Sequence, residues 1–179
     1  EDAKISDFVP GEGYSIIPEV EGNKIDVDKA KEYIKSQLLI LNEDINLDYE
    51  NNDLYIRPAK RSNDTTLNLA LNNLNKYISA RISYEKLNVL NGDTIHKWLT
   101  VNSDGSVSIS DDGIASFVKT IANAYNTSGK PKTLKTSYGP TVTITGGSYG
   151  WKVDEEKEKA TIKSLIEAGE TTTREPEFS

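Results

Sequence analysis

Cysteine and methionine are both absent from this chain of 179 residues, and it contains a single histidine, His96. The lack of cysteine excludes a thiol nucleophile, a disulfide and any zinc site built on cysteine. One histidine cannot form a metal-binding pair, and we interpret His96, close to Trp98, as a surface or partly packed helix residue. No metal, cofactor or catalytic residue is therefore expected.

Other signals of an enzyme are missing as well. The sequence has no GxxxxGK[ST] or GxGxxG phosphate-binding loop, and the acidic residues 102–112 lack the order of a calcium loop. The carboxylate pairs Asp111/Asp112 and Glu155/Glu156 fall where first helical turns are expected, and the helix dipole favours acids there. The pattern thus favours structural capping over acid–base catalysis.

The charge balance limits the partners of the chain. Lysine and arginine number 21 against 28 acidic residues, which gives a net charge of −7. This argues against binding to nucleic acid or to an anionic membrane, since both need a basic surface. No apolar run approaches the roughly 20 residues needed to span a bilayer, and the start resembles no signal peptide. Because the chain opens with Glu1 and has no methionine, we expect it to be a piece of a longer protein.

A sequence repeat organises the chain. Residues 22–36 (GNKIDVDKAKEYIKS) align without a gap with residues 150–164 (GWKVDEEKEKATIKS). In each copy an aspartate, Asp26 or Asp154, precedes an amphipathic pattern and is expected to cap a helix. A weaker third copy runs from a strand-like segment at 107–110 into a helical pattern that ends at Tyr125. The chain is thus predicted to use one strand-cap-helix unit several times.

Hydrophobic periodicity and turn residues predict the remaining elements. Strands are expected over 14–17, 44–54 and 81–90, the last ending in a tight turn at Asn91-Gly92, and a hairpin over 134–138 and 141–145. Beyond the repeats, helices are expected over 64–78, capped by Asp64, and over the short segment 94–99. The predicted fold class is α+β: four main helices on small, mainly antiparallel sheets, in two lobes related by the repeat. One continuous sheet with helices on one face is the alternative.

The domain prediction follows from this order of elements. Residues 1–12 read as a linker, because Pro10, Gly11 and Gly13 punctuate their end. Residues 13–179 are expected to form one accessory domain, with lobes at about 13–80 and 81–179.

The segment 146–151 (GGSYGW) joins the predicted hairpin to the last helix. Its paired glycines permit backbone angles that other residues avoid. Tyr149 and Trp151 give this corner two large surfaces, either to bury or to present to a ligand. A packed turn is the plainer interpretation, because tryptophan and tyrosine are usually well buried.

Four motifs occur in an order that carries a family resemblance. They are YSIIPEVEGNKID at 14–26, LNGDTI at 90–95 with Trp98-Leu99 after it, YNT at 125–127, and GGSYGW at 146–151. In this order they resemble the peptidoglycan-binding domain found ahead of L,D-transpeptidase catalytic domains, and the resemblance spans about 14–176. Related accessory domains also occur in VanW-like surface proteins.

The resemblance implies a non-catalytic cell-wall module of a Gram-positive surface protein. Its expected partners are peptidoglycan, as glycan or stem peptide, and a fused or neighbouring catalytic domain. Its expected location is extracellular, at the wall or cell surface, in a parent protein anchored to the membrane. The transpeptidase nucleophile is a cysteine in a His-Gly-Cys motif, which this chain lacks, so the chain alone is not expected to be an enzyme.

Three functions stay open at this point. The first is a recognition module whose exposed aromatic residues stack on sugar faces, and the candidates are Trp151, Tyr149, Tyr138 and Trp98. The second is a scaffold that orients a fused catalytic domain and binds nothing specific. The third is a protein–protein adaptor. Burial of both Trp151 and Tyr149 would favour the scaffold, whereas a groove lined by both would favour glycan binding.

Overall fold

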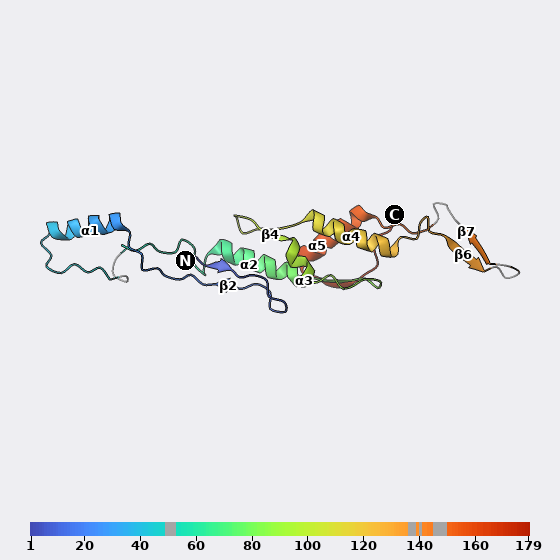
Figure 1. Ribbon diagram of the computed structural model, residues 1–179, viewed down its shortest axis with the longest axis horizontal. Helices are drawn as coiled ribbons and strands as arrows, with labels where there is room; N and C mark the ends of the chain where they lie inside the picture. The colour runs from blue at the N-terminus through green and yellow to red at the C-terminus, as the bar shows by residue number, and fades with distance from the viewer. Residues whose placement is uncertain (49–52, 136–138, 140, 145–149) are drawn as a thin grey trace. The chain divides into compact units, whose positions relative to one another are not determined.

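The computed structural model describes residues 1–48, 53–135, 139, 141–144 and 150–179. The chain divides into two compact units, of which the first comprises Glu1–Asp7 and Ser15–Asn68. The second comprises Phe8–Tyr14 and Leu69–Ser179, so the last of the three crossings between the units falls within helix α2 (Thr65–Ile78). Figure 1 labels the helices and several of the strands along the chain. Within the described ranges, no helix has both the length and the apolar character needed to cross a membrane.

The first unit is small and has few buried side chains. Strand β1 (Lys4–Ile5) pairs antiparallel with β2 (Ile16–Ile17), and helix α1 (Val27–Leu39) follows. The Asp26 carboxylate accepts hydrogen bonds from the N–H groups of Asp28 and Lys29, which caps the helix. Helix α1 contains no buried residue.

The second unit holds the hydrophobic core. Strand β3 (Arg81–Ser83) pairs in parallel with β8 (Thr171–Thr173), and helices α4 (Asp111–Tyr125) and α5 (Glu155–Ala168) pack against each other. These elements bury a shared aliphatic cluster that includes Ile82, Leu90, Ile95, Ile114, Val118, Ile121, Ile162 and Ile166. Burial of each such side chain contributes about 1.5–3 kcal/mol, so this cluster dominates the stability of the unit.

The remaining elements of the second unit are short. Helix α3 (Gly92–Ile95) continues into a 3₁₀ turn, η1 (His96–Trp98). Strand β4 (Leu99–Val101) then pairs antiparallel with β5 (Val107–Ile109), and Ser110 caps α4 by accepting from the Gly113 N–H. Strands β6 (Lys132–Lys135) and β7 (Thr141–Ile144) form an antiparallel hairpin, in whose backbone register residue 134 pairs with residue 142.

The α+β fold class is confirmed, with small and mainly antiparallel sheets. The described residues contain five α-helices: the four main ones and the short α3. Asp26, Asp64 and Asp154 cap helices as expected, and the repeated strand-cap-helix unit is present in β5–Ser110–α4. The predicted hairpin is present too, although its residues 136–138, 140 and 145 lie outside the described part.

Three local predictions are wrong. No strand forms in the described residues of 44–54, because the Asn46 side chain accepts from the Asp48 N–H at 2.7 Å and turns the chain. The strand expected over 81–90 stops at Ser83, and Leu90 returns as an isolated bridge to Ile82. The tight turn expected at Asn91-Gly92 is instead the start of α3, which Asn91 caps. The alternative of one continuous sheet is also wrong, since the described strands form four separate pairs.

Candidate functional site

Among the described residues of the second unit, Trp151 is a large aromatic residue with a strongly exposed side chain. Its side chain is 64% exposed, whereas the backbone on both sides of it is firmly held. The Trp151 N–H donates to the Thr127 hydroxyl at 2.9 Å, and its carbonyl accepts from the N–H groups of Thr127 and Ser128. The Val153 N–H also donates to the Asn126 side chain at 2.8 Å. The indole is therefore presented to solvent from a fixed backbone.

Gly150 makes this close approach possible. Its φ of 139° lies in the region that favours glycine, and a Cβ built there would lie 2.6 Å from the Ser128 nitrogen. A side chain would thus push the 150–153 strand-like segment away from 126–128 and release Trp151.

A shallow groove of about 310 Å³ surrounds the indole. Phe178 lies beside it, with ring centroids 5.4 Å apart and planes tilted by 51°. Tyr125 forms part of the floor, its hydroxyl accepts from the Lys86 N–H, and the Lys86 ammonium lies 4.6 Å from its ring centroid. Charged and hydroxyl groups complete the lining, from Glu85, Lys86, Thr127 and Glu175. Such a mixture of aromatic faces and polar groups suits a sugar or a peptide.

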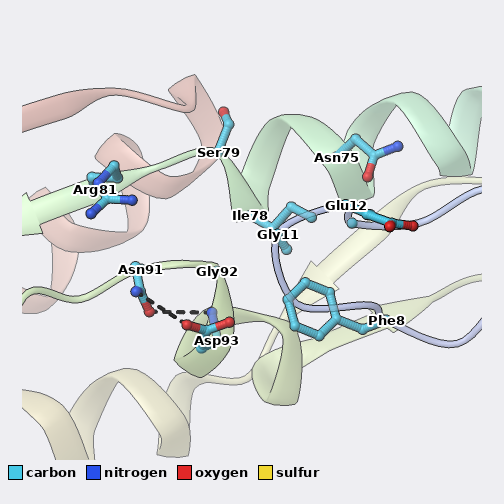
Figure 2. A pocket seen from close by; sticks show the side chains of 11 residues that line it. Phe8, Gly11, Glu12, Asn75, Ile78, Ser79, Arg81, Asn91, Gly92 and Asp93 are labelled. Carbon is cyan, nitrogen blue, oxygen red and sulfur yellow. Dashed lines mark hydrogen bonds between the residues drawn. The ribbon is translucent and has the colours of Figure 1, made fainter.

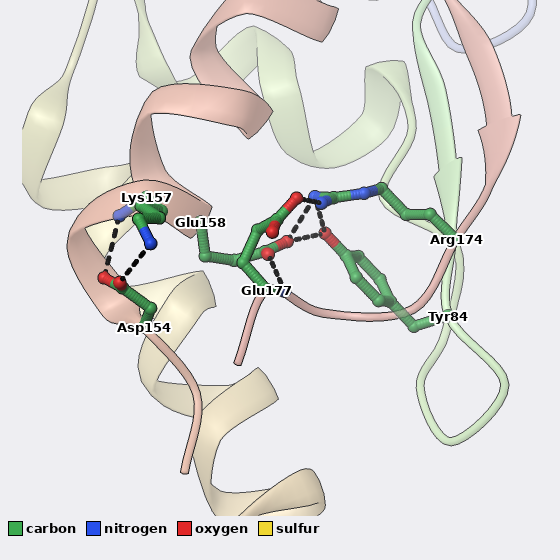
Figure 3. A network of polar contacts seen from close by, with 6 residues as sticks. All are labelled: Tyr84, Asp154, Lys157, Glu158, Arg174 and Glu177. Atoms are coloured by element: carbon green, nitrogen blue, oxygen red, sulfur yellow. Dashed lines mark hydrogen bonds and ion pairs between the residues drawn. The ribbon is translucent and has the colours of Figure 1, made fainter. Parts of the chain in front are cut away.

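A buried polar network fixes the C-terminal segment that carries Phe178. Glu158 on α5 is fully buried, and its carboxylate accepts from the Tyr84 hydroxyl, from Arg174 Nη1 at 2.6 Å and from the Glu177 N–H at 2.8 Å (Figure 3). Arg174 also donates to the Glu177 carboxylate at 3.0 Å. Because the buried charge is paired and fully hydrogen-bonded, it holds this segment in one position.

The network also sets the protonation state of the tyrosine. Burial raises the pKa of Tyr84 far above its ordinary value, and the hydrogen bond to Glu158 raises it further. Tyr84 therefore stays a neutral donor over the physiological range, while Glu158 acts as the acceptor. This arrangement supports the groove rather than chemistry in it, because both groups are enclosed by protein.

A second hollow of the same unit, about 420 Å³, lies between the 8–14 loop, the end of α2 and the start of α3 (Figure 2). The asparagine side chains that line this hollow already make structural hydrogen bonds. The Asn75 side chain accepts from the Tyr14 N–H and donates to the Tyr14 carbonyl, and Asn91 caps α3. Phe8 stacks on His96 with centroids 4.1 Å apart. We therefore interpret this hollow as part of the packing contact that holds the 8–14 loop in place.

The structure separates the aromatic residues proposed from the sequence. Trp151 lines the groove, whereas Trp98 is partly buried, packs against the core and lies with its ring 6.3 Å from that of Phe117. Trp98 is not among the residues that line the groove. Tyr138 and Tyr149 lie outside the described residues. The ligand-binding role of these four residues stays a prediction.

Sequence reasoning missed the neighbours of Trp151. Phe178, Lys86 and Glu175 come from segments distant in the chain, and no local pattern marks them. Phe178 forms a bridge with Val153, as Tyr55 does with Ile25 in the first copy of the repeat. The two aromatic residues lie at different distances from their capping aspartates, so the ungapped sequence repeat gives no signal for Phe178.

Comparisons with known proteins agree with this architecture. The family model described as "Putative peptidoglycan binding domain" matches residues 61–174. Among solved structures, the avibactam carbamoyl enzyme of Ldtfm is 26% identical, with a TM-score of 0.51 over 63% of this chain and 46% of that chain. A cysteine-to-serine mutant of the Enterococcus faecium L,D-transpeptidase is 24% identical, with a TM-score of 0.48 over 65% of this chain and 46% of its own. The chain thus spans less than half the length of these structures. No curated protein matches it.

Proposed function

Because the chain belongs to the peptidoglycan-binding domain family, whose model covers well over half of it, we propose that it recognises peptidoglycan through the Trp151 groove. The groove is the surface hollow of about 310 Å³ formed around Trp151 by Tyr125, Phe178 and their polar neighbours. In this proposal the chain binds the wall and leaves the chemistry to another domain.

The exposure of Trp151 on a rigid backbone is the observation that carries the proposal. The exposed indole lies in one groove with Phe178 and Tyr125, and a cluster of aromatic surface of this kind, rather than a single exposed ring, indicates contact with a partner. Its backbone is held by Thr127 and Ser128, and Phe178 supports one side of the ring. A flat apolar face that is already ordered can stack on a sugar ring with little loss of conformational entropy.

The polar side chains at the rim of the groove can bind the polar and charged groups of peptidoglycan. Peptidoglycan combines sugars, which bear hydroxyl and acetamide groups, with short peptides, which bear carboxylates and amines. Lys86 offers a cation at the rim, and Glu85 and Glu175 offer carboxylates. Hydrogen bonds to such charged groups are stronger than neutral ones, so the rim can fix the orientation of a ligand stacked on Trp151.

Catalysis is assigned to a different part of the parent protein. The chain contains no cysteine, and L,D-transpeptidases of the kind it resembles act through one. We infer a parent in which this domain is joined to a transpeptidase-type or other wall-active domain at the surface of a Gram-positive cell. The chain by itself should leave muropeptides unchanged, and chromatography of the incubated mixture checks this.

Co-sedimentation with peptidoglycan stripped of teichoic acids tests the recognition. The acidic chain gains no general attraction to anionic wall polymers, so pelleting reports stacking and hydrogen bonding. Replacing Trp151 by alanine should reduce the pelleted fraction at least about tenfold, the loss typical of an aromatic hot spot. Leu39→Ala, which removes a side chain that is 84% exposed elsewhere, is the matched control and should pellet like the wild type.

Two results would overturn the proposal. If the wild-type chain stays in the supernatant at high wall concentration and moderate salt, the chain is a scaffold that spaces a neighbouring domain. If Trp151→Ala pellets as well as the wild type while both are folded by circular dichroism, recognition takes place on another surface.

A further inference from the structure

Helices α1 and α5 are built alike at their starts. Asp26 donates its N–H to the Leu54 carbonyl at 2.7 Å, and Asp154 donates to the Glu177 carbonyl at 2.8 Å. Two residues earlier, the carbonyls of Lys24 and Lys152 accept from Ile56 at 2.8 Å and from Ser179 at 2.9 Å. The same bridge therefore precedes the same aspartate cap in both copies.

The two helices also end alike. Leu41 and Gly169 have positive φ angles of 55° and 71°. Their N–H groups donate to the carbonyls of Leu38 and Ile166 at 3.1 and 3.0 Å. Residues 22–42 therefore align without a gap with residues 150–170. Each position of α1 has a defined counterpart in α5.

Helix α5 shows what this element packs against. Its inner residues Ile162 and Ile166 are fully buried in the core that α4 completes. At the edge of this contact, the Lys163 ammonium lies 3.0 Å from a carboxylate oxygen of Asp111, in the first turn of α4. The partner of α5 is thus an amphipathic helix with an acidic first turn.

Helix α1 keeps the same three groups without such a partner. Ile34, Lys35 and Leu38 are the counterparts of Ile162, Lys163 and Ile166. Leu38 is 59% exposed, and α1 has no buried residue at all. A shallow hollow of about 360 Å³, lined by Lys35, Leu38 and Leu39, marks this face. Among the described residues, Lys35 makes no ion pair.

The C-terminal end of α1 exposes further apolar side chains, and this exposure is unfavourable in water. Leu39, Ile40 and Leu41 are 84%, 68% and 86% exposed, where α5 has Glu167, Ala168 and Gly169. Leu41 also adopts a left-handed conformation that a β-carbon disfavours. A contiguous exposed apolar patch of this kind is typical of an interaction surface.

We propose that α1 is a docking surface for an amphipathic helix of the α4 kind, supplied by another domain of the same family in which no α5-type helix covers that helix. Its aliphatic stripe would cover Ile34 and Leu38, and its acidic first turn would pair with Lys35. A second copy of this chain does not fit, because its own α4 is already covered by α5. An anionic membrane does not fit either, because Asp28 and Glu32 accompany the lysines of α1 and the chain is acidic.

A stapled peptide tests this proposal with the full 179-residue chain. The probe covers residues 110–126, carries a fluorophore, and is cross-linked through positions 116 and 120, which are exposed in α4. The staple preforms the helix, and circular dichroism verifies it. Fluorescence anisotropy should show saturable binding. Leu38→Asp in the chain should weaken binding more than about tenfold, because a charge would enter an apolar contact.

The charge pair gives the sharper control. Lys35→Glu should weaken binding about threefold, and a peptide with Asp111→Lys should restore it to that variant, because the pair is then reversed. Lys29→Glu makes the same charge change at the counterpart of the exposed Lys157 and should leave binding unchanged.

Three outcomes would overturn the proposal. One is a helical peptide that does not bind, or that binds Leu38→Asp equally well. Another is self-association of the chain, by analytical ultracentrifugation, that Leu38→Asp abolishes. The third is co-flotation of the chain with anionic vesicles that Leu38→Asp abolishes.

Discussion

Helices α1 and α5 belong to two aligned copies of one sequence repeat and make the same backbone contacts at their ends, yet only α5 belongs to a core. Both begin at an aspartate cap after a bridge and end at a residue with positive φ. Ile166 of α5 is fully buried, whereas its counterpart Leu38 is 59% exposed. Local sequence therefore determines the element, and the surrounding chain determines how much the element stabilises the fold.

The polar contacts differ in the same way. Glu158 of α5 anchors the C-terminal segment through Tyr84, Arg174 and Glu177, and thereby supports Phe178 beside Trp151. The corresponding position of α1 is Ala30, so the first copy has no such anchor. The repeat supplies a framework, and the groove arises only where this network has been added to it.

The largest expected effect comes from placing a charge on the inner face of each helix. Ile166→Asp should lower the free energy of unfolding by more than about 4 kcal/mol, because an unpaired carboxylate would enter the core. Leu38→Asp should change it by less than about 0.5 kcal/mol, because that side chain is already solvated. Urea titration of both variants checks this. Equal losses would mean that α1 is packed as α5 is.

A smaller difference is expected at the glycine that opens each copy. Gly150→Ala should cost about 1–3 kcal/mol, because φ is 139° and the new Cβ would meet the Ser128 backbone at 2.6 Å. At Gly22 the nearest atom to a Cβ is 3.8 Å away, so Gly22→Ala should be nearly neutral. Thermal melts compare the two, and an unchanged melt for Gly150→Ala would remove the structural basis for the fixed indole.

The residues that end the two helices should respond in opposite directions. Leu41→Gly should stabilise the first unit by about 1 kcal/mol, because glycine adopts positive φ without strain. Gly169→Ala should destabilise the second unit, because its Cβ would lie 2.7 Å from the Lys76 carbonyl oxygen. Hydrogen exchange resolved by residue measures each unit separately. A loss of protection around α1 in Leu41→Gly would contradict the assignment.

The smallest effect concerns pH. The hydrogen bond from the Lys157 N–H lowers the pKa of Asp154 below its ordinary value. A depressed pKa means that the cap stabilises the fold above the unfolded pKa of about 4, and that this contribution is lost as the pH falls through the lower folded value. Wild type and Asp154→Ala should therefore differ in stability at pH 7 and converge in strong acid. Melts at a series of pH values check this, and a constant difference would exclude the linkage.

The sequence predicted most of what depends on neighbouring residues. Asp26, Asp64 and Asp154 were identifiable as caps because a capping carboxylate acts within its own first turn. The β6–β7 hairpin was identifiable because its strands are close in the chain. The alternation at 44–48 was misleading, because the Asn46 side chain accepts from the Asp48 N–H and turns the chain there, which an alternating pattern does not reveal.

The candidate site was predictable only in part. Trp151 was found from its glycine-rich context, but burial decides between a packed turn and a displayed ring, and burial depends on distant segments. Phe178, Lys86 and Glu175 reach the groove through the β3–β8 pairing and the Glu158 network. No periodic pattern in the sequence indicates that these three residues lie close to Trp151.

Tryptophan fluorescence tests the central claim most directly. The chain has two tryptophans, of which Trp151 is exposed and Trp98 partly buried, so a ligand stacked in the groove should alter mainly the Trp151 emission. Titration with soluble muropeptides should give a saturable blue shift in the wild type and none in Trp151→Phe. An unchanged wild-type spectrum, or the same shift in Trp151→Phe, would contradict recognition through this groove.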